Sequence, residues 1–400
     1  MREMVKLKYI ADSFSSSLSM DSVLDDGLYE VYGASGFIGY KNVYKVNHKY
    51  IGIIKDGAGV GRANIFEAKT NILGTMAYIY PKNSNNTDIL FMKYAIDAMN
   101  LGKGDDDKTT IPHIYFSKYG NNKIYHPSLQ EQQLIANFLD EKCNEIDSLT
   151  SDIQKQIETL QEYKKSVITE AVTKGLDKDA KMKDSGVPWI GEVPDGWKTP
   201  KLKNVAILTN GDRGKNYPSG NDLVDDGICF FTANNIHEQY LDCSNDKNKF
   251  ITESRYHILG GAKIKLNDIL FCLRGSTAGN AAINKTVNAG TIASSLVCIT
   301  PQYINPDYLN YYLQSEMNAI QTSLFMNGSC AANLSAENVL NYYIIQPPTL
   351  EQQQIVSYLD SKCSEIDALL QNYENQIATL EEYKKSLIYE YVTGKKEALE

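Results

Sequence analysis

The chain has 400 residues, 42% of them hydrophobic, and a formal net charge of −9. This length and composition predict two to three folded domains and exclude a globally disordered protein. The seven cysteines include no C-x-x-C pair, which argues against a zinc ribbon and against a secreted disulfide framework. The first residues lack the apolar core of a signal peptide, and no window approaches a membrane span, so we expect a cytoplasmic protein.

Residues 1–128 are predicted to form a first globular domain that is rich in β-strands. Short apolar runs, among them Tyr29–Tyr32, Tyr50–Ile54 and Met76–Tyr80, alternate with glycine and asparagine residues that mark turns. A helix is expected at about Asp88–Met99. The sequence therefore predicts a β-rich lobe with one helical segment before the first long helical region.

Residues 129–186 are predicted to form a first helical region and a polar linker. We expect a short helix from about Leu129 and a longer one from Ile146, where apolar residues recur in steps of three and four. A stripe of this kind would be exposed on a single helix, so it predicts packing against another helix. About 28 residues at 1.5 Å rise give a rod of roughly 40 Å. The residues predicted to pack are Ile146, Leu149, Ile153, Ile157, Leu160 and Val167.

Residues 187–346 are predicted to form a second globular domain, and residues 347–400 a second helical region. The second helical region carries an apolar stripe with the spacing of the first, which makes the two stripes natural partners. Its predicted packing residues are Ile366, Leu369, Ile377, Leu380 and Leu387.

The two helical regions are copies of one another. Residues 131–173 and 351–393, aligned without a gap, share 25 identities in 43 positions. Weaker sequence similarities link the two globular stretches. We therefore interpret the chain as a duplication of one unit that consists of a globular domain and a helix. The expected fold class is α+β: two β-rich domains joined by two long antiparallel helices that form a coiled coil with a pseudo-two-fold axis.

Charge is distributed unevenly along this plan. Residues 126–186 and 347–400 carry net charges of −4 and −5, whereas residues 1–125 and 187–346 carry +2 and −2. The helical regions therefore hold all of the net negative charge, and the two globular stretches together are neutral. Neutrality leaves room for a basic face on either globular domain, but the electrostatic signal is weak by itself.

A search for catalytic chemistry finds little. Gly57–Gly61 is not G-x-G-x-x-G because Arg62 stands at the position of the third glycine, so we interpret it as a turn between strands. Asn305–Tyr308 lacks the second proline of the N-P-P-Y loop of amino-methyltransferases. The five histidines show no metal-ligand spacing, and we predict no metal site. These observations favour a protein without catalytic residues of its own.

The sequence features that do indicate a function are polar and cationic residues suited to recognising a ligand. Lys55 and Arg274 each place a cation at the end of an apolar strand, before small residues that allow close backbone approach. Arg, Lys and Asn side chains are those that read purine edges or bind phosphates. The predicted DNA-binding residues are Lys55, Arg62, Asn64, Arg213, Lys215, Asn216, Arg274, Ser276 and Thr277.

At this point the sequence resembles a known family, the specificity (S) subunits of Type I restriction–modification systems. The likeness is carried by the two helical segments, with their Glu-Gln-Gln and Glu-Tyr-Lys-Lys-Ser motifs, by the opener Asp184–Trp197 and by the stretch Ala332–Ser335. The Trp-Ile-Gly…Gly-Trp opener has no counterpart before the first domain. The two globular domains also differ strongly from one another, which implies an asymmetric target.

The resemblance implies a sequence-specific protein that binds double-stranded DNA with a bipartite target, one target-recognition domain per half. It also implies a coiled coil that docks two modification (M) subunits and restriction (R) subunits, with S-adenosylmethionine bound by the M subunit and no cofactor in this chain. Two alternatives stay open on the residues alone. One is a coiled-coil adaptor with protein-binding lobes, and the other is an enzyme that uses a nucleotide at Gly57–Gly61.

Overall fold

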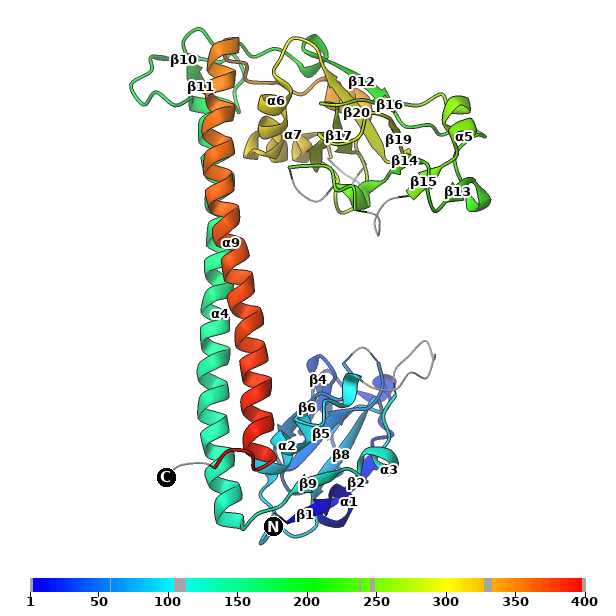
Figure 1. Cartoon of the computed structure of the whole chain (residues 1–400), viewed down its shortest axis with the longest axis vertical. Coiled ribbons are helices and arrows are strands. Elements are labelled where there is room, and N and C mark those ends of the chain that lie inside the picture. The colour runs from blue at the N-terminus through cyan, green and yellow to red at the C-terminus, as the bar shows by residue number, and fades with distance from the viewer. Residues whose placement is uncertain are drawn as a thin grey trace. The chain divides into compact units, whose positions relative to one another are not determined.

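The computed structural model divides into two compact units, Met1–Lys155 with Tyr373–Glu400 and Gln156–Asn372. Each unit holds one β-rich lobe and one half of each of two long helices (Figure 1). His237 and Cys330 lie outside the residues that the structure describes. Those residues are 3–57, 59–103, 113–236, 239–244, 249–326 and 333–397.

Lobe 1, from β1 to β9, is built on a four-stranded antiparallel sheet with the order β2-β8-β5-β6. Strand β5 is buried at every position, as its unbroken apolar run requires. Helix α2 begins after Asp88, whose carboxylate accepts the backbone N–H of Phe91 at 2.8 Å as an N-cap. The bounds are β2 Ala11–Ser15, β5 Tyr50–Ile54, β6 Ala63–Phe66, β8 Met76–Pro81 and α2 Ile89–Asp97.

A smaller sheet and short elements complete lobe 1. The order β4-β3-β7 includes a parallel pairing of β3 with β7, and β1 pairs with β9 next to the start of the first long helix. These elements are β1 Met4–Lys6, α1 Leu7–Ile10, η1 Met20–Ser22, β3 Tyr29–Gly33, β4 Gly36–Lys41, β7 Asn71–Ile72, η2 Leu101–Lys103, α3 Phe116–Tyr119 and β9 Lys123–Tyr125.

Lobe 2, from β12 to α8, repeats the main sheet of lobe 1. Its order β12-β20-β17-β18 matches β2-β8-β5-β6, and α6 follows β20 as α2 follows β8. Asn305 caps α6 in the way that Asp88 caps α2. The duplication seen in the sequence is thus a duplication of the fold. The bounds are β12 Ala206–Asn210, β17 Ile269–Cys272, β18 Ala281–Ile283, β20 Leu296–Pro301, α6 Pro306–Gln314, α7 Glu316–Phe325 and α8 Ala336–Leu340.

Lobe 2 has a larger second sheet than lobe 1. Its order is β13-β15-β14-β19-β16, and the parallel pair of β14 with β19 corresponds to β3 with β7. Ahead of lobe 2, the stretch predicted as a polar linker contains the strand β10, paired with β11. These elements are β10 Met182–Asp184, β11 Glu192–Pro194, η3 Leu202–Asn204, η4 Gly220–Asp222, β13 Leu223–Val224, β14 Ile228–Phe231, η5 Ala233–Asn235, β15 Lys249–Ile251, α5 Glu253–Ile258, β16 Lys263–Ile264 and β19 Gly290–Ile292.

The long helices are α4, Leu129–Lys174, and α9, Thr349–Val392. The predicted division of the first helical region into a short and a long helix is wrong, because α4 continues through Ile146 without a break. The physical reason is plain in the sequence: no glycine or proline occurs between residues 129 and 174, so nothing interrupts the backbone hydrogen bonds.

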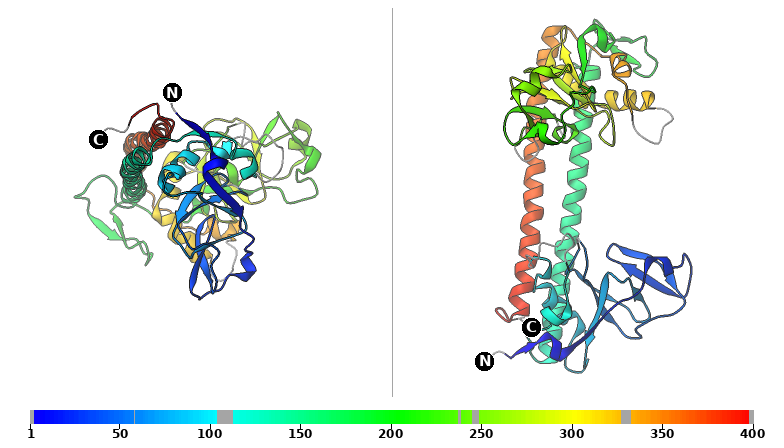
Figure 2. Two further views of the ribbon diagram at one scale, coloured as in Figure 1. Left: turned by 90° about the horizontal axis from the view of Figure 1, so that it is seen from below. Right: turned by 90° about the vertical axis from the view of Figure 1, so that its right-hand side faces the viewer.

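The two helices pack antiparallel within each unit, where their ribbons run side by side in both figures (Figures 1 and 2). In unit 1, Lys384 of α9 lies 2.6 Å from the carboxylate of Asp147 on α4. In unit 2, Lys164 of α4 lies 2.6 Å from the carboxylate of Asp367 on α9. These ion pairs join matched positions of the repeat with the roles of the two helices exchanged.

The residues buried between the two helices, which form their seam, recur in strictly alternating steps of three and four, which the predicted stripe did not follow at every position. Leu149 and Leu369, predicted to pack, are 50% and 47% exposed, so these two assignments are wrong. Alternating steps of three and four residues place the next positions, Thr150 and Leu370, in the seam, and both are partly buried. The other predicted residues are buried or partly buried: Ile146, Ile153, Ile157, Leu160, Val167, Ile366, Ile377, Leu380 and Leu387.

Candidate nucleic-acid interface

Two turns at matched places of the main sheets share one backbone geometry. In lobe 1, after β5, the Gly61 N–H donates to the Ile54 carbonyl at 2.9 Å. In lobe 2, after β17, the Gly279 N–H donates to the Cys272 carbonyl at the same distance. Gly61 and Gly279 have φ values of +87° and +95°, which favour glycine. Gly57 and residues 59–61 therefore form part of a strand-to-strand turn, as interpreted from the sequence, and Ala58 lies outside the described residues.

The matched geometry corrects the register between the lobes. The carbonyl of Lys55 accepts the N–H of Ile114 at 2.9 Å, and the carbonyl of Leu273 accepts the N–H of Leu334 at 2.8 Å. Lys55 therefore corresponds to Leu273. The residue that matches Arg274 is the next one, Asp56, so the pairing of Lys55 with Arg274 that the sequence suggested is wrong by one position.

In lobe 1 the turn carries a small charged cluster around Asp56. Its Oδ2 accepts from Lys55 Nζ at 2.7 Å, and its Oδ1 lies 2.6 Å from His113 Nδ1. Partial burial acts to raise the pKa of Asp56, but the hydrogen bonds from Lys55 and His113 outweigh it and hold that pKa below the usual value. The carboxylate therefore stays ionised and binds both partners.

The other two predicted residues of lobe 1 lie close to this cluster in the chain. Arg62 is exposed, and its Nε donates to the carbonyl of Gly59 at 3.4 Å, which directs the side chain back over its own turn. Asn64 is exposed on β6. Both side chains belong to the turn and strand that follow β5, so the three predicted residues of lobe 1 come from one hairpin.

In lobe 2 the matched turn presents a different set of side chains. Arg274 and Ser276 are exposed, and Thr277 is half-buried. The backbone of Arg274 forms a β-bridge with Asn333, an exposed residue, at the place where Asp56 bridges His113 in lobe 1. The turn has the same backbone hydrogen bonds in both lobes, which we call its frame, but lobe 1 has Asp56 where lobe 2 has Arg274, so the charges are opposite.

The remaining predicted residues of lobe 2 lie in the loop after β12. Arg213 and Lys215 are exposed, and Asn216 is half-buried. The Arg213 guanidinium donates to the carbonyl of Ser294 at 3.2 Å. Asp212 accepts the backbone N–H of Gly214 at 2.7 Å, a hydrogen bond that helps to lower its pKa.

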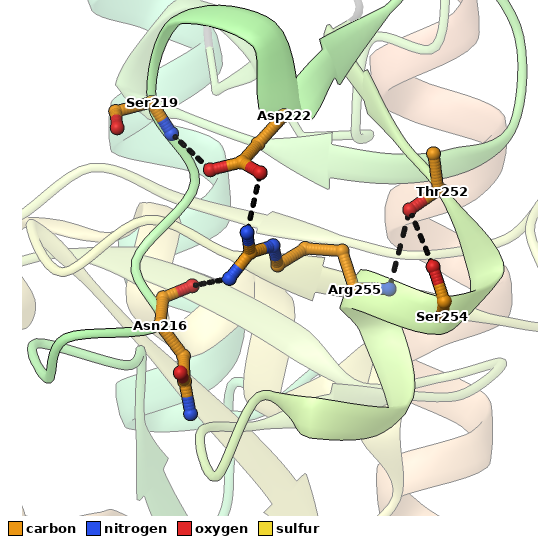
Figure 3. Close-up of polar contacts among 6 residues, drawn as sticks. All are labelled: Asn216, Ser219, Asp222, Thr252, Ser254 and Arg255. Atoms are coloured by element: carbon orange, nitrogen blue, oxygen red, sulfur yellow. Dashed lines mark hydrogen bonds and ion pairs between the residues drawn. The ribbon is translucent and has the colours of Figure 1, made fainter.

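A residue that the sequence did not single out, Arg255 on α5, holds this loop in place (Figure 3). Its guanidinium donates to the carboxylate of Asp222 and, at 3.3 Å, to the backbone carbonyl of Asn216. The same carboxylate accepts the backbone N–H of Ser219 at 3.2 Å. Two hydrogen bonds from one planar guanidinium therefore fix residues that lie 39 and 33 positions away in the chain.

No group of three or more His, Cys, Asp or Glu side chains in the described parts of the chain is arranged to hold a metal ion. No helix in the same residues is long and apolar enough to cross a membrane. What stands out in the two lobes is a matched pair of polar turns.

Comparison with known proteins identifies the family. Residues 3–159 and 194–379 both match the model of the Type I restriction modification DNA specificity domain. The chain belongs to the Type I restriction–modification specificity family. The two matches together span most of the chain, and each includes a lobe and part of a long helix.

Relatives in this family resemble the chain over most of its length. The Type I restriction enzyme MjaVIII specificity subunit of Methanocaldococcus jannaschii is 27% identical over 358 residues, which are 88% of this chain and 80% of that protein. The EcoBI specificity subunit of Escherichia coli is 23% identical over 293 residues, or 71% of this chain and 60% of that protein. These matches agree with a Type I specificity subunit that recognises DNA.

A solved structure shares the fold. It was determined in a study of complex assembly and conformational transition of the type I R-M system. The two chains are 14% identical, and the match covers 98% of each with a TM-score of 0.71. At this identity the likeness concerns the fold, and it agrees with an α+β architecture of two β-rich lobes and two long helices.

Proposed function

We propose that this specificity subunit binds an asymmetric, bipartite DNA target, with lobe 1 contacting one half and lobe 2 the other. The observation that carries the proposal is the matched turn: one backbone frame in both lobes, with Asp56 at the position where lobe 2 has Arg274. A repeated frame suits the same duplex geometry twice. Different side chains on it suit two different sequences of bases.

The exposed polar residues of the lobes supply the proposed contacts. Arg62 and Asn64 in lobe 1, and Arg213, Lys215 and Arg274 in lobe 2, have accessible side chains of the kinds that bind phosphates and purine edges. Lys55 is less accessible, with 20% of its side chain exposed and its ammonium paired with Asp56. We therefore assign Lys55 to the support of the turn rather than to a direct contact.

The domain boundaries proposed from the sequence separate the DNA-contacting lobes from the helical regions. Residues 1–128 and 187–346 are the proposed target-recognition domains, and residues 129–186 and 347–400 are the helical regions. The long helices α4 and α9 begin at Leu129 and Thr349, close to two of these boundaries.

The helices also offer two equivalent surfaces for a partner. Leu149 and Leu369, which lie outside the seam, and Tyr163 and Tyr383 are between 47% and 56% exposed, and each pair occupies matched positions of the repeat. Apolar side chains repeated in this way suit two copies of one protein. We assign these surfaces to two M subunits, which would bind S-adenosylmethionine and methylate DNA and, with R subunits, complete the complex. On this proposal the present chain is not itself an enzyme.

The proposal is tested with the complex assembled from this chain and its M subunits. Methylation of a genomic DNA library should occur at one bipartite sequence with two unlike halves. Charged residues at Leu149 and Leu369 together should weaken assembly with the M subunits, while the midpoint of thermal unfolding of this chain changes little. Binding to duplex DNA that ignores sequence would instead support a protein-binding adaptor, and nucleotide binding by the isolated chain would support an enzyme.

A further inference from the structure

We infer that His113, held by Asp56, and Asn333, beside Arg274, are base-reading residues, and that the difference between these two pairs gives the lobes different base preferences at one matched position. The inference rests on the proposed function and goes beyond it, because it names the side chains that set one letter of each half-target.

The two pairs have the same backbone setting. Asp56 and His113 form an isolated antiparallel β-bridge in lobe 1, and Arg274 and Asn333 form one in lobe 2. In lobe 1, Ile114 donates its N–H to the carbonyl of Lys55 at 2.9 Å. In lobe 2, Leu334 donates its N–H to the carbonyl of Leu273 at 2.8 Å. This equivalent backbone bond beside each bridge places the four side chains at corresponding positions of the two lobes.

In lobe 1 the chemistry favours a histidine with a fixed ring. The ionised carboxylate of Asp56 only accepts hydrogen bonds, so the hydrogen of their 2.6 Å contact belongs to His113 Nδ1. With Nδ1 directed to Asp56, Nε2 is the ring nitrogen that remains to hydrogen-bond with a base edge. Tyr115 lies nearly parallel to the ring, with an interplanar angle of 18° and centroids 6.5 Å apart.

Exposure separates the roles of the residues in this cluster. The His113 side chain is 40% exposed, whereas those of Lys55 and Asp56 are 20% and 24% exposed. The most accessible member is His113, whose Nε2 makes no hydrogen bond to any residue that the structure describes. The two less accessible members neutralise each other's charge. Asp56 and Lys55 are therefore positioning residues, and His113 is the group available to DNA.

In lobe 2 the chemistry differs at both positions. Arg274 and Asn333 are exposed. An arginine can bind O6 and N7 of guanine together, and an asparagine can bind N6 and N7 of adenine. Lobe 2 thus presents groups suited to purines on the frame where lobe 1 presents a histidine supported by a carboxylate.

The test is a graft between the lobes, measured in the complete complex with M subunits. Asp56→Arg with His113→Asn gives lobe 1 the pair of lobe 2. Sequencing of methylated sites should then show a changed base at one position of the half-target read by lobe 1, with discrimination for the original base reduced about 5- to 150-fold. The half-target read by lobe 2 should stay the same.

A matched control and a reciprocal graft make the result decisive. Asp12→Asn alters another lobe 1 carboxylate with a lysine nearby, Lys82 at 3.7 Å, and should leave the methylated sequence unchanged. If the first graft fails to assemble, Arg274→Asp with Asn333→His asks the same question in lobe 2. An unchanged methylated sequence in an assembled graft would overturn the inference.

Failure of the inference is distinguishable from failure of the proposed function. If the grafts leave the sequence unchanged while the unmodified complex still methylates a bipartite target, only the assignment of the bridge residues is wrong. If the unmodified complex methylates no specific sequence, the proposed function itself is wrong, and the inference falls with it.

Discussion

The side chain of Gln352 is fixed to the backbone of Asn305: its Oε1 accepts the Asn305 N–H at 2.8 Å. In the other unit, Gln132 accepts the N–H of Asp88 at 2.9 Å. Both glutamines are buried, and both acceptor contacts lead to the N-cap residue of a lobe helix. The same contact, a buried glutamine of a long helix that accepts the N–H of an N-cap residue, therefore joins each lobe to a long helix. We call this contact the clamp.

This clamp makes a prediction about stability. Gln352→Leu leaves the part-buried N–H of Asn305 without its acceptor and should lower the free energy of unfolding by about 1–3 kcal/mol. Gln353→Leu is a matched control, because Gln353 is exposed on the same helix and should change that free energy by less than about 0.5 kcal/mol. Urea titration followed by circular dichroism measures both. Equal effects of the two substitutions would contradict the clamp.

The corrected seam predicts a contrast between two neighbouring apolar residues of α4. Ile153 is 5% exposed and Leu149 is 50% exposed. Ile153→Ala should lower the free energy of unfolding by about 2–3 kcal/mol, and Leu149→Ala by less than about 1 kcal/mol. Denaturant titration of both variants would show the contrast, and a similar loss for Leu149→Ala would restore the stripe first predicted from the sequence.

The helices show what could be predicted from sequence and what could not. The repeat and the apolar period correctly predicted that two long helices pack against one another, since this follows from side-chain spacing, but they did not predict that α4 runs unbroken from Leu129. The assignment of Leu149 to the seam was wrong because its hydrophobicity was weighed above the regular alternation of steps. The seam position next to it is filled by Thr150, a residue that no apolar count would select.

The loop clamped by Arg255 predicts a local effect. Arg255→Ala removes the hydrogen bonds to Asp222 and to the Asn216 carbonyl. We expect the amides of residues 216–224 to exchange hydrogen about tenfold faster, with the exchange of β17 unchanged. His257→Ala is the control on the same helix, since its side chain is 70% exposed. Unchanged hydrogen exchange in residues 216–224 would show that Arg255 does not stabilise the loop.

The same loop has an expected dependence on pH. A hydrogen bond from the Ser219 backbone, and next the contact with Arg255, lower the pKa of Asp222 below 3.8. A carboxyl group with a lowered pKa stabilises the folded state above pH 3.8, and that contribution is lost as the pH falls through the folded-state value. Asp222→Asn should therefore lessen the drop in unfolding temperature between pH 5 and pH 3. An unchanged drop would contradict a role for this carboxylate in stability.

The candidate interface was only partly predictable. Cations after apolar strands pointed to residues that the structure places in one hairpin of lobe 1 and in the matched turn of lobe 2. The contact of Asp56 with His113 joins residues 57 positions apart, and no local pattern links them. The one-residue shift that matches Asp56 with Arg274 is likewise set by backbone hydrogen bonds rather than by residue type.

The central claim is that each lobe reads one half of a bipartite target. The most direct measurement is the sequence of methylated sites made by the complex with Arg274→Ala, compared with the complex with Arg62→Ala. We predict that Arg274→Ala lowers discrimination only in the half read by lobe 2, by about 1–3 kcal/mol, and that Arg62→Ala affects only the other half. Loss of discrimination in both halves by either single substitution would contradict the account.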